Sequence, residues 1–111
     1  MNLASVQRVV EILPIPEADN IVEVRLLGWG IVCKKDEFQV GQLVSYIMID
    51  TIVPETDQFE FLRQRKFRVR TIRLKKVLSQ GLVIPLPEGK WKEGDDLTDI
   101  IGVKKYEKPD N

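Results

Sequence analysis

The chain has 111 residues, of which 43% are hydrophobic and 31% charged, values ordinary for one globular domain with a hydrophobic core. It has no histidine and one cysteine, which excludes the usual histidine-based acid–base and triad chemistry and an internal disulfide. Its net charge is zero, but the charges are not evenly spread.

The first half of the chain predicts short strands separated by turns. The segment ASVQRVVEI has a period of two, with Ala4, Val6, Val10 and Ile12 on one face and Arg8 as the exception. PIPEADN is then a turn, since proline, aspartate and asparagine favour turn geometry. LVSYIMI is apolar on both faces, which predicts a strand covered on both sides. The predicted strands cover residues 4–12, 21–27, 31–35, 43–49, 66–76 and 81–86.

Two short helices are predicted between or after these strands. In TDQFEFLRQ, Asp57 and Glu60 form a capping-box-like pair, and Phe59 shares a helical face with Leu62. DDLTDIIG predicts a second short helix that Gly102 ends. We expect residues 1–103 to form the domain and residues 104–111 to be a linker.

Five or six short strands, with one short helix before the penultimate strand, predict an all-β Greek-key barrel. The OB-fold is the main candidate, and its strands and loops commonly bind oligonucleotides. An SH3-like barrel is the structural alternative.

The stretch FLRQRKFRVRTIRLKK is strongly basic. Between residues 63 and 76 there are eight cations and no acid, whereas residues 1–62 sum to −6 and residues 77–111 to −2. A localised basic stripe is typical of proteins that bind a phosphate backbone. The candidate nucleic-acid-binding residues are Arg63, Arg65, Lys66, Arg68, Arg70, Arg73, Lys75 and Lys76. The alternative is a solvated strand face whose cations pair with Glu60, Asp57 and other carboxylates.

The spacing of these cations predicts an irregularity in the strand. Lys66, Arg68 and Arg70 share one face, but Arg73 and Lys75 fall on the other face of a regular strand. A β-bulge or sharp coil between residues 70 and 72 would return all five cations to one outer face.

The aromatic residues give a weaker indication. Phe59, Phe61 and Phe67 have core-like spacings, and Trp29 either plugs the barrel end or forms an exposed stacking platform. Because few rings are interleaved with the basic residues, the pattern favours contact with a duplex backbone over stacking of single-stranded bases.

No catalytic or metal site is predicted in this chain. It lacks a glycine-rich phosphate loop and the Cys or His spacings of short metal motifs. Cys33, in the apolar context GIVCKK, is expected to be a core residue, which fits a reducing cytoplasm. No apolar run is long enough to span a membrane, and the first residues lack an export signal. We therefore expect a cytoplasmic protein that is not an enzyme by itself.

Nearly the whole chain resembles the N-terminal domain of the Deinococcus-type RNA ligases. The resemblance is most specific in RVRTIRLKKVLSQGL, and GVKKYEKP resembles the family's bridge into its next domain. It implies an OB domain followed by a nucleotidyltransferase domain. The implied activity is ATP-dependent sealing of a 3′-hydroxyl RNA end to a 5′-phosphate in a nicked duplex, as in RNA repair, through a lysine–AMP intermediate and a divalent metal, Mg or Mn.

The catalytic Lys-x-Asp-Gly motif of that family is absent from these residues, and Lys35-Asp36-Glu37 does not match it. The resemblance therefore implies a monomeric, substrate-gripping domain whose partners are nicked duplex RNA or an RNA–DNA hybrid and a nucleotidyltransferase domain of the same polypeptide. No cofactor is expected in this chain, and ATP and the metal would belong to the other domain.

Two other interpretations remain open. PIPEADNIVEVRLLG and SQG also resemble the free-standing tRNA-binding OB modules associated with aminoacyl-tRNA synthetases. Alternatively, the basic face docks an acidic protein surface. In the ligase interpretation, Ser79 and Gln80 are either phosphate contacts or turn caps, and Gly81 serves a backbone turn before the last strand.

Overall fold

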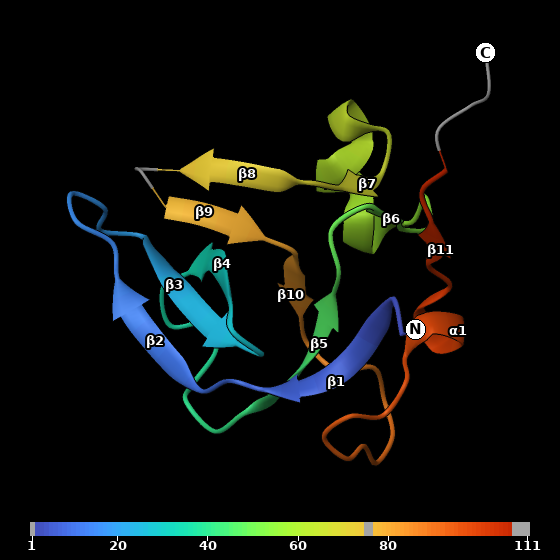
Figure 1. The fold of residues 1–111 in the computed structure, drawn as a ribbon, viewed down its shortest axis with the longest axis horizontal. Helices are drawn as coiled ribbons and strands as arrows, with labels where there is room; N and C mark the ends of the chain where they lie inside the picture. The colour runs from blue at the N-terminus through green and yellow to red at the C-terminus, as the bar shows by residue number, and fades with distance from the viewer. Residues whose placement is uncertain (1, 75–76, 108–111) are drawn as a thin grey trace.

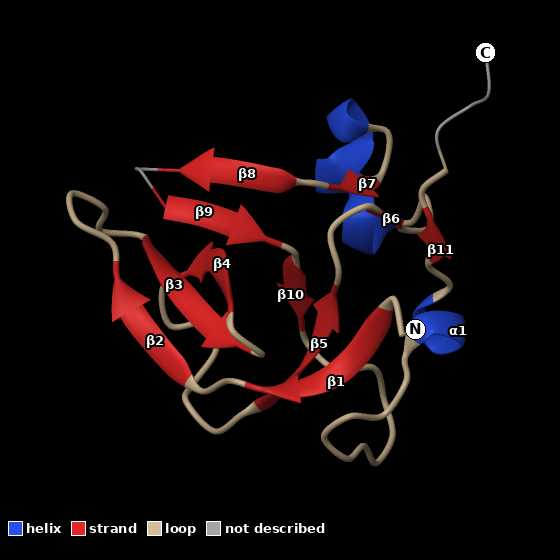
Figure 2. Ribbon diagram, viewed as in Figure 1, coloured by secondary structure: helices blue, strands red, loops and turns tan. Residues whose placement is uncertain are grey.

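The computed structural model describes residues 2–74 and 77–107 (Figure 1). Figure 2 shows mostly strands, with short helical segments. In chain order the elements are β1 (Ala4–Arg8), β2 (Glu11–Pro14), β3 (Ile21–Leu26), β4 (Trp29–Lys34), β5 (Leu43–Ile47), β6 (Thr51–Ile52), the 3₁₀ helix η1 (Asp57–Arg65), β7 (Arg68–Val69), β8 (Thr71–Leu74), β9 (Val77–Gln80), β10 (Leu82–Ile84), α1 (Thr98–Ile101) and β11 (Lys104–Lys105).

The strands form a small barrel from antiparallel pairs. β5 lies between β1 and β10, and β3 lies between β2 and β4. β9 continues toward β10 and lies against β4, where the hydroxyl of Ser79 accepts a hydrogen bond from the backbone N–H of Val32 at 2.9 Å. These contacts connect the sheet β1-β5-β10 to the sheet β2-β3-β4, and the predicted all-β OB-fold barrel is confirmed.

The first strand bends where β1 passes into β2. Val9 is buried and Val10 is 67% exposed, so the prediction that Val10 shares the face of Ala4 and Val6 is wrong. β1 pairs with β5 and β2 pairs with β3, and the two intervening residues let the chain turn from one sheet to the other. Bends of this kind close small barrels.

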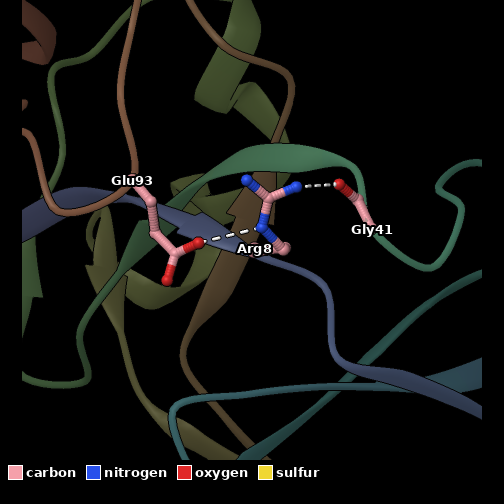
Figure 3. A network of polar contacts seen from close by, with 3 residues as sticks. All are labelled: Arg8, Gly41 and Glu93. Carbon is pink, nitrogen blue, oxygen red and sulfur yellow. Dashed lines mark hydrogen bonds and ion pairs between the residues drawn. The ribbon is translucent and has the colours of Figure 1, made fainter.

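Arg8 belongs to this bend, at the end of β1. Its Nε donates to Glu93 at 2.9 Å and its Nη1 donates to the carbonyl of Gly41 at 2.7 Å (Figure 3). The cation that interrupts the apolar pattern is therefore an outer-surface residue that links three segments of the chain.

β5 is covered on both sides, as its sequence predicts. Ile47 belongs to a core cluster with Phe59 of η1, while Val44 and Tyr46 belong to a second cluster inside the barrel, together with Cys33. Alternate residues of one strand thus enter two separate cores, because successive side chains of a strand point to opposite faces.

The segment from β6 to β7 covers the outer face of β5. β6 pairs with both β7 and β11, and η1 buries Phe59 and Leu62. The predicted capping pair of Asp57 and Glu60 is wrong, because Thr56 is the N-cap and no side chain caps the helix. The second predicted helix is confirmed as α1, and Gly102 ends it in the left-handed region with φ of 85°.

The strands predicted at residues 21–27 and 31–35 leave residues 28–30 for a turn, but the turn lies one residue earlier. Leu27 and Gly28 both have positive φ and connect paired strands at Leu26 and Trp29, as in a tight two-residue hairpin. Trp29 is half-buried and packs against the inner core cluster, which agrees with a plug rather than with an exposed platform.

Three further strands were not predicted: β6, β9 and β11. Within the expected linker, Lys104–Lys105 pairs with β6, and the N–H of Tyr106 donates to the carbonyl of Asp50 at 3.0 Å. The chain therefore stays attached to the domain as far as Tyr106. No described helix is long and apolar enough to cross a membrane.

Gly81 has little room for a side chain. It has φ of 133°, and an added Cβ would lie 2.5 Å from Cε1 of Tyr46 and 2.9 Å from the carbonyl oxygen of Ile47. We expect Gly81→Ala to lower the free energy of unfolding by roughly 2–4 kcal/mol, through backbone strain and overpacking together. Urea denaturation measures the loss.

Gly41→Ala is the matched control for Gly81→Ala. Gly41 also has positive φ, at 89°, but an added Cβ there would meet nothing within 4 Å. It should cost only the backbone strain, about 1 kcal/mol. Equal losses in the two variants would show that the contact with Tyr46 is unimportant.

Candidate nucleic-acid interface

The basic segment of residues 63–76 begins in η1 and continues into two different strand pairs. After η1, Lys66 and Phe67 both take left-handed conformations, with φ of 55° and 58°, and redirect the chain into β7. β7 pairs with β6, whereas β8 pairs with β9. The predicted interruption is confirmed as a one-residue break at Arg70, between the two strands.

Two arginines of the segment are neutralised by acids from outside it. Arg63 donates to both oxygens of Glu60, at 2.5 and 3.0 Å. This hydrogen bond lowers the pKa of Glu60 and raises that of Arg63. Arg68 donates to Asp50 at 2.6 Å. For Arg63 and Arg68 the alternative of an ion-paired surface is therefore correct.

Arg68 also makes an aromatic contact. Its guanidinium lies 3.8 Å from the ring centroid of Tyr106, while the backbone N–H of Tyr106 donates to the carbonyl of Asp50. Arg68 is half-buried as a result. Asp50, Arg68 and Tyr106 form one cluster, which we call the exit cluster because it holds Tyr106, near the end of the described residues, against the domain.

Three cations remain exposed beside the exit cluster. Arg65, Lys66 and Arg70 make no ion pair among residues 2–74 and 77–107. A hollow of about 330 Å³ lies among them, and we call it the basic hollow. It is lined by Ile52, Gln64, Arg65, Lys66, Arg68, Arg70 and Tyr106. An anion entering it would meet the charges of Arg65, Lys66 and Arg70, which pair with no carboxylate among the described residues.

The structure gathers only part of the predicted set of cations. Arg65, Lys66, Arg68 and Arg70 line the basic hollow, and Arg63 points its charge to Glu60 instead. Arg73 is exposed on β8 and does not line the hollow. Lys75 and Lys76 lie outside the described residues.

Three residues at the end of β9 and directly after it have structural roles: Ser79, Gln80 and Gly81. Ser79 is buried and its hydroxyl accepts from the N–H of Val32 on β4. The carbonyl of Gln80 accepts from the hydroxyl of Tyr46 at 2.9 Å. Gly81 allows β10 to pass close to Tyr46 and Ile47. The hydroxyl of Ser79 therefore joins β9 to β4 rather than capping a turn, and the alternative of a phosphate contact stays a prediction.

The prediction that Phe61 lies in the core is wrong. Its side chain is 62% exposed, while Phe59 and Phe67 are buried. Phe59 and Leu62 are three residues apart and share the inner side of η1, whereas Phe61, two residues after Phe59, points to another side of the helix. Phe61 is the one aromatic residue of the described chain that is exposed.

The described residues offer no catalytic or metal constellation. Burial and the nearby charge of Glu37 raise the pKa of the Cys33 thiol to about 12, so the thiol is protonated at neutral pH. No group of three or more Cys, Asp or Glu residues among residues 2–74 and 77–107 is placed to hold a metal ion.

Comparison with known proteins agrees with the fold described above. A family model described as an OB-fold domain matches residues 3–86. The chain belongs to this OB-fold domain family. No curated protein matches it.

Solved structures of an RNA ligase from Naegleria gruberi match this OB-fold domain over almost all of its length. The complex with pyrophosphate has 34% sequence identity and a TM-score of 0.90 over 100% of this chain and 37% of the ligase chain. A point mutant without ligand has 35% identity and a TM-score of 0.89, covering 97% and 36%. A point mutant with ATP and Mn has 36% identity and a TM-score of 0.85, covering 96% and 36%.

The OB-fold domain is therefore related to RNA ligases. It spans 36–37% of the length of the ligase chains that it matches. The remainder of those chains has no counterpart in these 111 residues.

Ser79→Ala tests the closure of the barrel. The substitution leaves the N–H of Val32 without its acceptor, and we expect the free energy of unfolding to fall by about 1–3 kcal/mol. Ser5→Ala is the control, since the hydroxyl of Ser5 accepts from the side-chain amide of Gln7 and, among the described residues, from no backbone N–H. It should cost less than about 1 kcal/mol in the same urea titration. A smaller loss for Ser79→Ala than for Ser5→Ala would contradict this role.

The raised pKa of Cys33 predicts a thiol that does not react in the native state. At pH 8, with the pKa near 12, the thiolate is scarce and the side chain is buried. We expect reaction with an aromatic disulfide reagent to be slower than in the urea-unfolded chain by on the order of a hundredfold or more. Similar rates in the two states would show that the thiol is accessible.

Proposed function

We propose that this OB-fold domain is the substrate-gripping domain of an RNA ligase of the Deinococcus type. It holds nicked duplex RNA, or an RNA–DNA hybrid, by its phosphate backbone. A nucleotidyltransferase domain of the same polypeptide then seals a 3′-hydroxyl RNA end to a 5′-phosphate with ATP. The protein acts as a monomer in the cytoplasm.

The observation that carries this proposal is the basic hollow. Arg65, Lys66 and Arg70 are exposed and make no ion pair among the described residues, in a domain that is 34–36% identical to part of an RNA ligase. Phosphate contacts from Arg and Lys supply most sequence-independent affinity for nucleic acids and make it salt-dependent. A nick can occur in any sequence, so a grip that reads no bases suits this task.

The exit cluster supports a division of roles within the basic segment. Arg68 donates a hydrogen bond to Asp50 and lies on the ring of Tyr106, so in this proposal it positions the chain where GVKKYEKP leaves the domain. The exposed cations Arg65, Lys66 and Arg70 are left to meet phosphates. Arg73, Lys75 and Lys76 extend the same segment of sequence and complete the proposed contact set with Arg63, whose pairing with Glu60 is exposed and weak.

ATP and the divalent metal belong to the proposed nucleotidyltransferase domain. The Naegleria ligase was solved with ATP and Mn. The residues of this chain do not fit either group, because Lys-x-Asp-Gly is absent and no metal cluster occurs in residues 2–74 and 77–107. No step of the sealing reaction runs through this domain, whose contribution is binding and orientation.

Charge reversal of two exposed arginines tests the grip. We expect Arg65→Glu with Arg70→Glu to weaken binding of a nicked RNA duplex at least tenfold at low salt. The slope of log K against log salt concentration should become shallower by about two units, one for each lost phosphate contact. Fluorescence anisotropy at several salt concentrations measures both quantities.

Lys90→Glu with Lys92→Glu is the matched control, with the same change in net charge. Both lysines are exposed in the loop of residues 85–95, which lies across the molecule from η1 and β8 (Figure 1). The control should keep the slope of the wild type. Equal losses in both variants would mean that only the overall charge matters. Competition by tRNA much stronger than by nicked duplex would instead support a tRNA-binding module.

A further inference from the structure

An apolar groove runs along the barrel beside the basic hollow. Its first part, of about 220 Å³, lies between η1 and the β8–β9 hairpin and has walls from Leu62, Val69, Ile72 and Leu74. Its second part, of about 420 Å³, lies over β4 and β10. Phe61, Val32 and Leu82 line both parts, so the two are continuous.

The ring of Phe61 lines this groove and is largely exposed to solvent. The side chain is 62% exposed although it lines both parts of the groove. Leu74 and Leu78 of the neighbouring hairpin are also 42% and 46% exposed. The domain therefore leaves an aromatic face and apolar walls open to solvent at one place.

The groove and the basic hollow share two residues. Arg65 and Arg70 line both, and neither makes an ion pair in the described part of the chain. They form a ridge with an apolar, aromatic surface on one side and a cationic surface on the other. A ligand that bridges the ridge needs a flat apolar group joined to an anion.

We propose that this groove binds an unpaired nucleotide of the bound strand, with its base stacked on Phe61 and its phosphate on Arg65 or Arg70. Stacking of a base on an aromatic ring, with a nearby arginine, is the usual means of holding single-stranded nucleic acid. A peptide partner would satisfy the apolar walls but would need an acidic group at the ridge, whereas a nucleotide always carries one. A fully paired duplex, in contrast, keeps its bases stacked within the helix and would leave the groove empty.

This inference rests on the proposed function and adds to it. A duplex grip explains the basic hollow but gives no role to the exposed ring. An unpaired nucleotide occurs where a strand end has left its duplex, so the groove would let the domain bind an interrupted strand more tightly than an intact one.

The experiment compares two probes of equal length and charge. One is a ten-nucleotide oligouridylate, and the other is a ribose-phosphate oligomer of the same length without bases. We expect the wild-type chain to bind the oligouridylate about five- to hundredfold more tightly. Phe61→Ala and Phe61→Leu should remove most of this preference, since leucine keeps the apolar surface but not the ring.

Two further variants complete the design. Phe61→Trp should keep the preference, and its fluorescence should be quenched by the oligouridylate but not by the oligomer without bases. Ile100→Ala removes a side chain of similar exposure, 56%, from α1, outside the groove, and should bind like the wild type. Thermal unfolding of each variant confirms that the fold is retained.

The outcomes separate this inference from the proposed function. Equal binding of the two probes, or a preference that survives in Phe61→Ala, overturns the nucleotide site. If nicked duplex binding still responds to Arg65 and Arg70 in that case, the phosphate grip stands. If neither the oligomers nor the nicked duplex bind, both proposals fail.

Discussion

The double burial of β5 is the constraint on which the rest of the structure depends. Ile47 packs into the cluster with Phe59, and Tyr46 packs into the barrel interior with Cys33. A strand with two apolar faces is stable only when both faces are covered, and burying each side chain contributes about 1.5–3 kcal/mol. The barrel covers one face of β5. The segment from β6 through η1 to β7 covers the other.

The position of the basic surface follows from this requirement. η1 must turn Phe59 and Leu62 toward β5, and a helix with three residues per turn then directs Phe61 and the intervening charges outward. Phe67 and Val69 continue the inner layer, which leaves Arg68 and Arg70 on the outside. The break at Arg70 releases β8 into a hairpin with β9, so the cations between the two strand pairs surround a hollow instead of a flat sheet face.

Much of the fold could be predicted from the sequence, because the spacing of apolar residues along a segment reflects which of its side chains are buried. The strand segments, the two-sided character of β5, the stop at Gly102 and the irregularity near Arg70 all follow from patterns within a few residues. The errors occurred where partners distant in the chain decide. Val10 is exposed because the first strand changes sheets after Val9, and Phe61 is exposed because η1 packs Phe59 and Leu62 into the core cluster of Ile47 and so turns Phe61 outward.

In the candidate site, too, residues outside the segment decide the outcome. The run of cations lacks an acid, but Asp50 and Glu60 pair with Arg68 and Arg63 from outside it. The sequence alone therefore gives eight cations that cannot be told apart. The fold divides those that the structure describes into ion-paired and unpaired cations. Arg68 is held on Tyr106 and fixes the exit of the chain, whereas Arg65 and Arg70 stay unpaired within the described chain, between a cationic and an apolar surface. Since the exit cluster and the basic hollow share Arg68 and Tyr106, a domain joined after Tyr106 would start beside the proposed phosphate site. The same short segment would thus set both the position of the nucleic acid and the direction of the chain toward the catalytic groups.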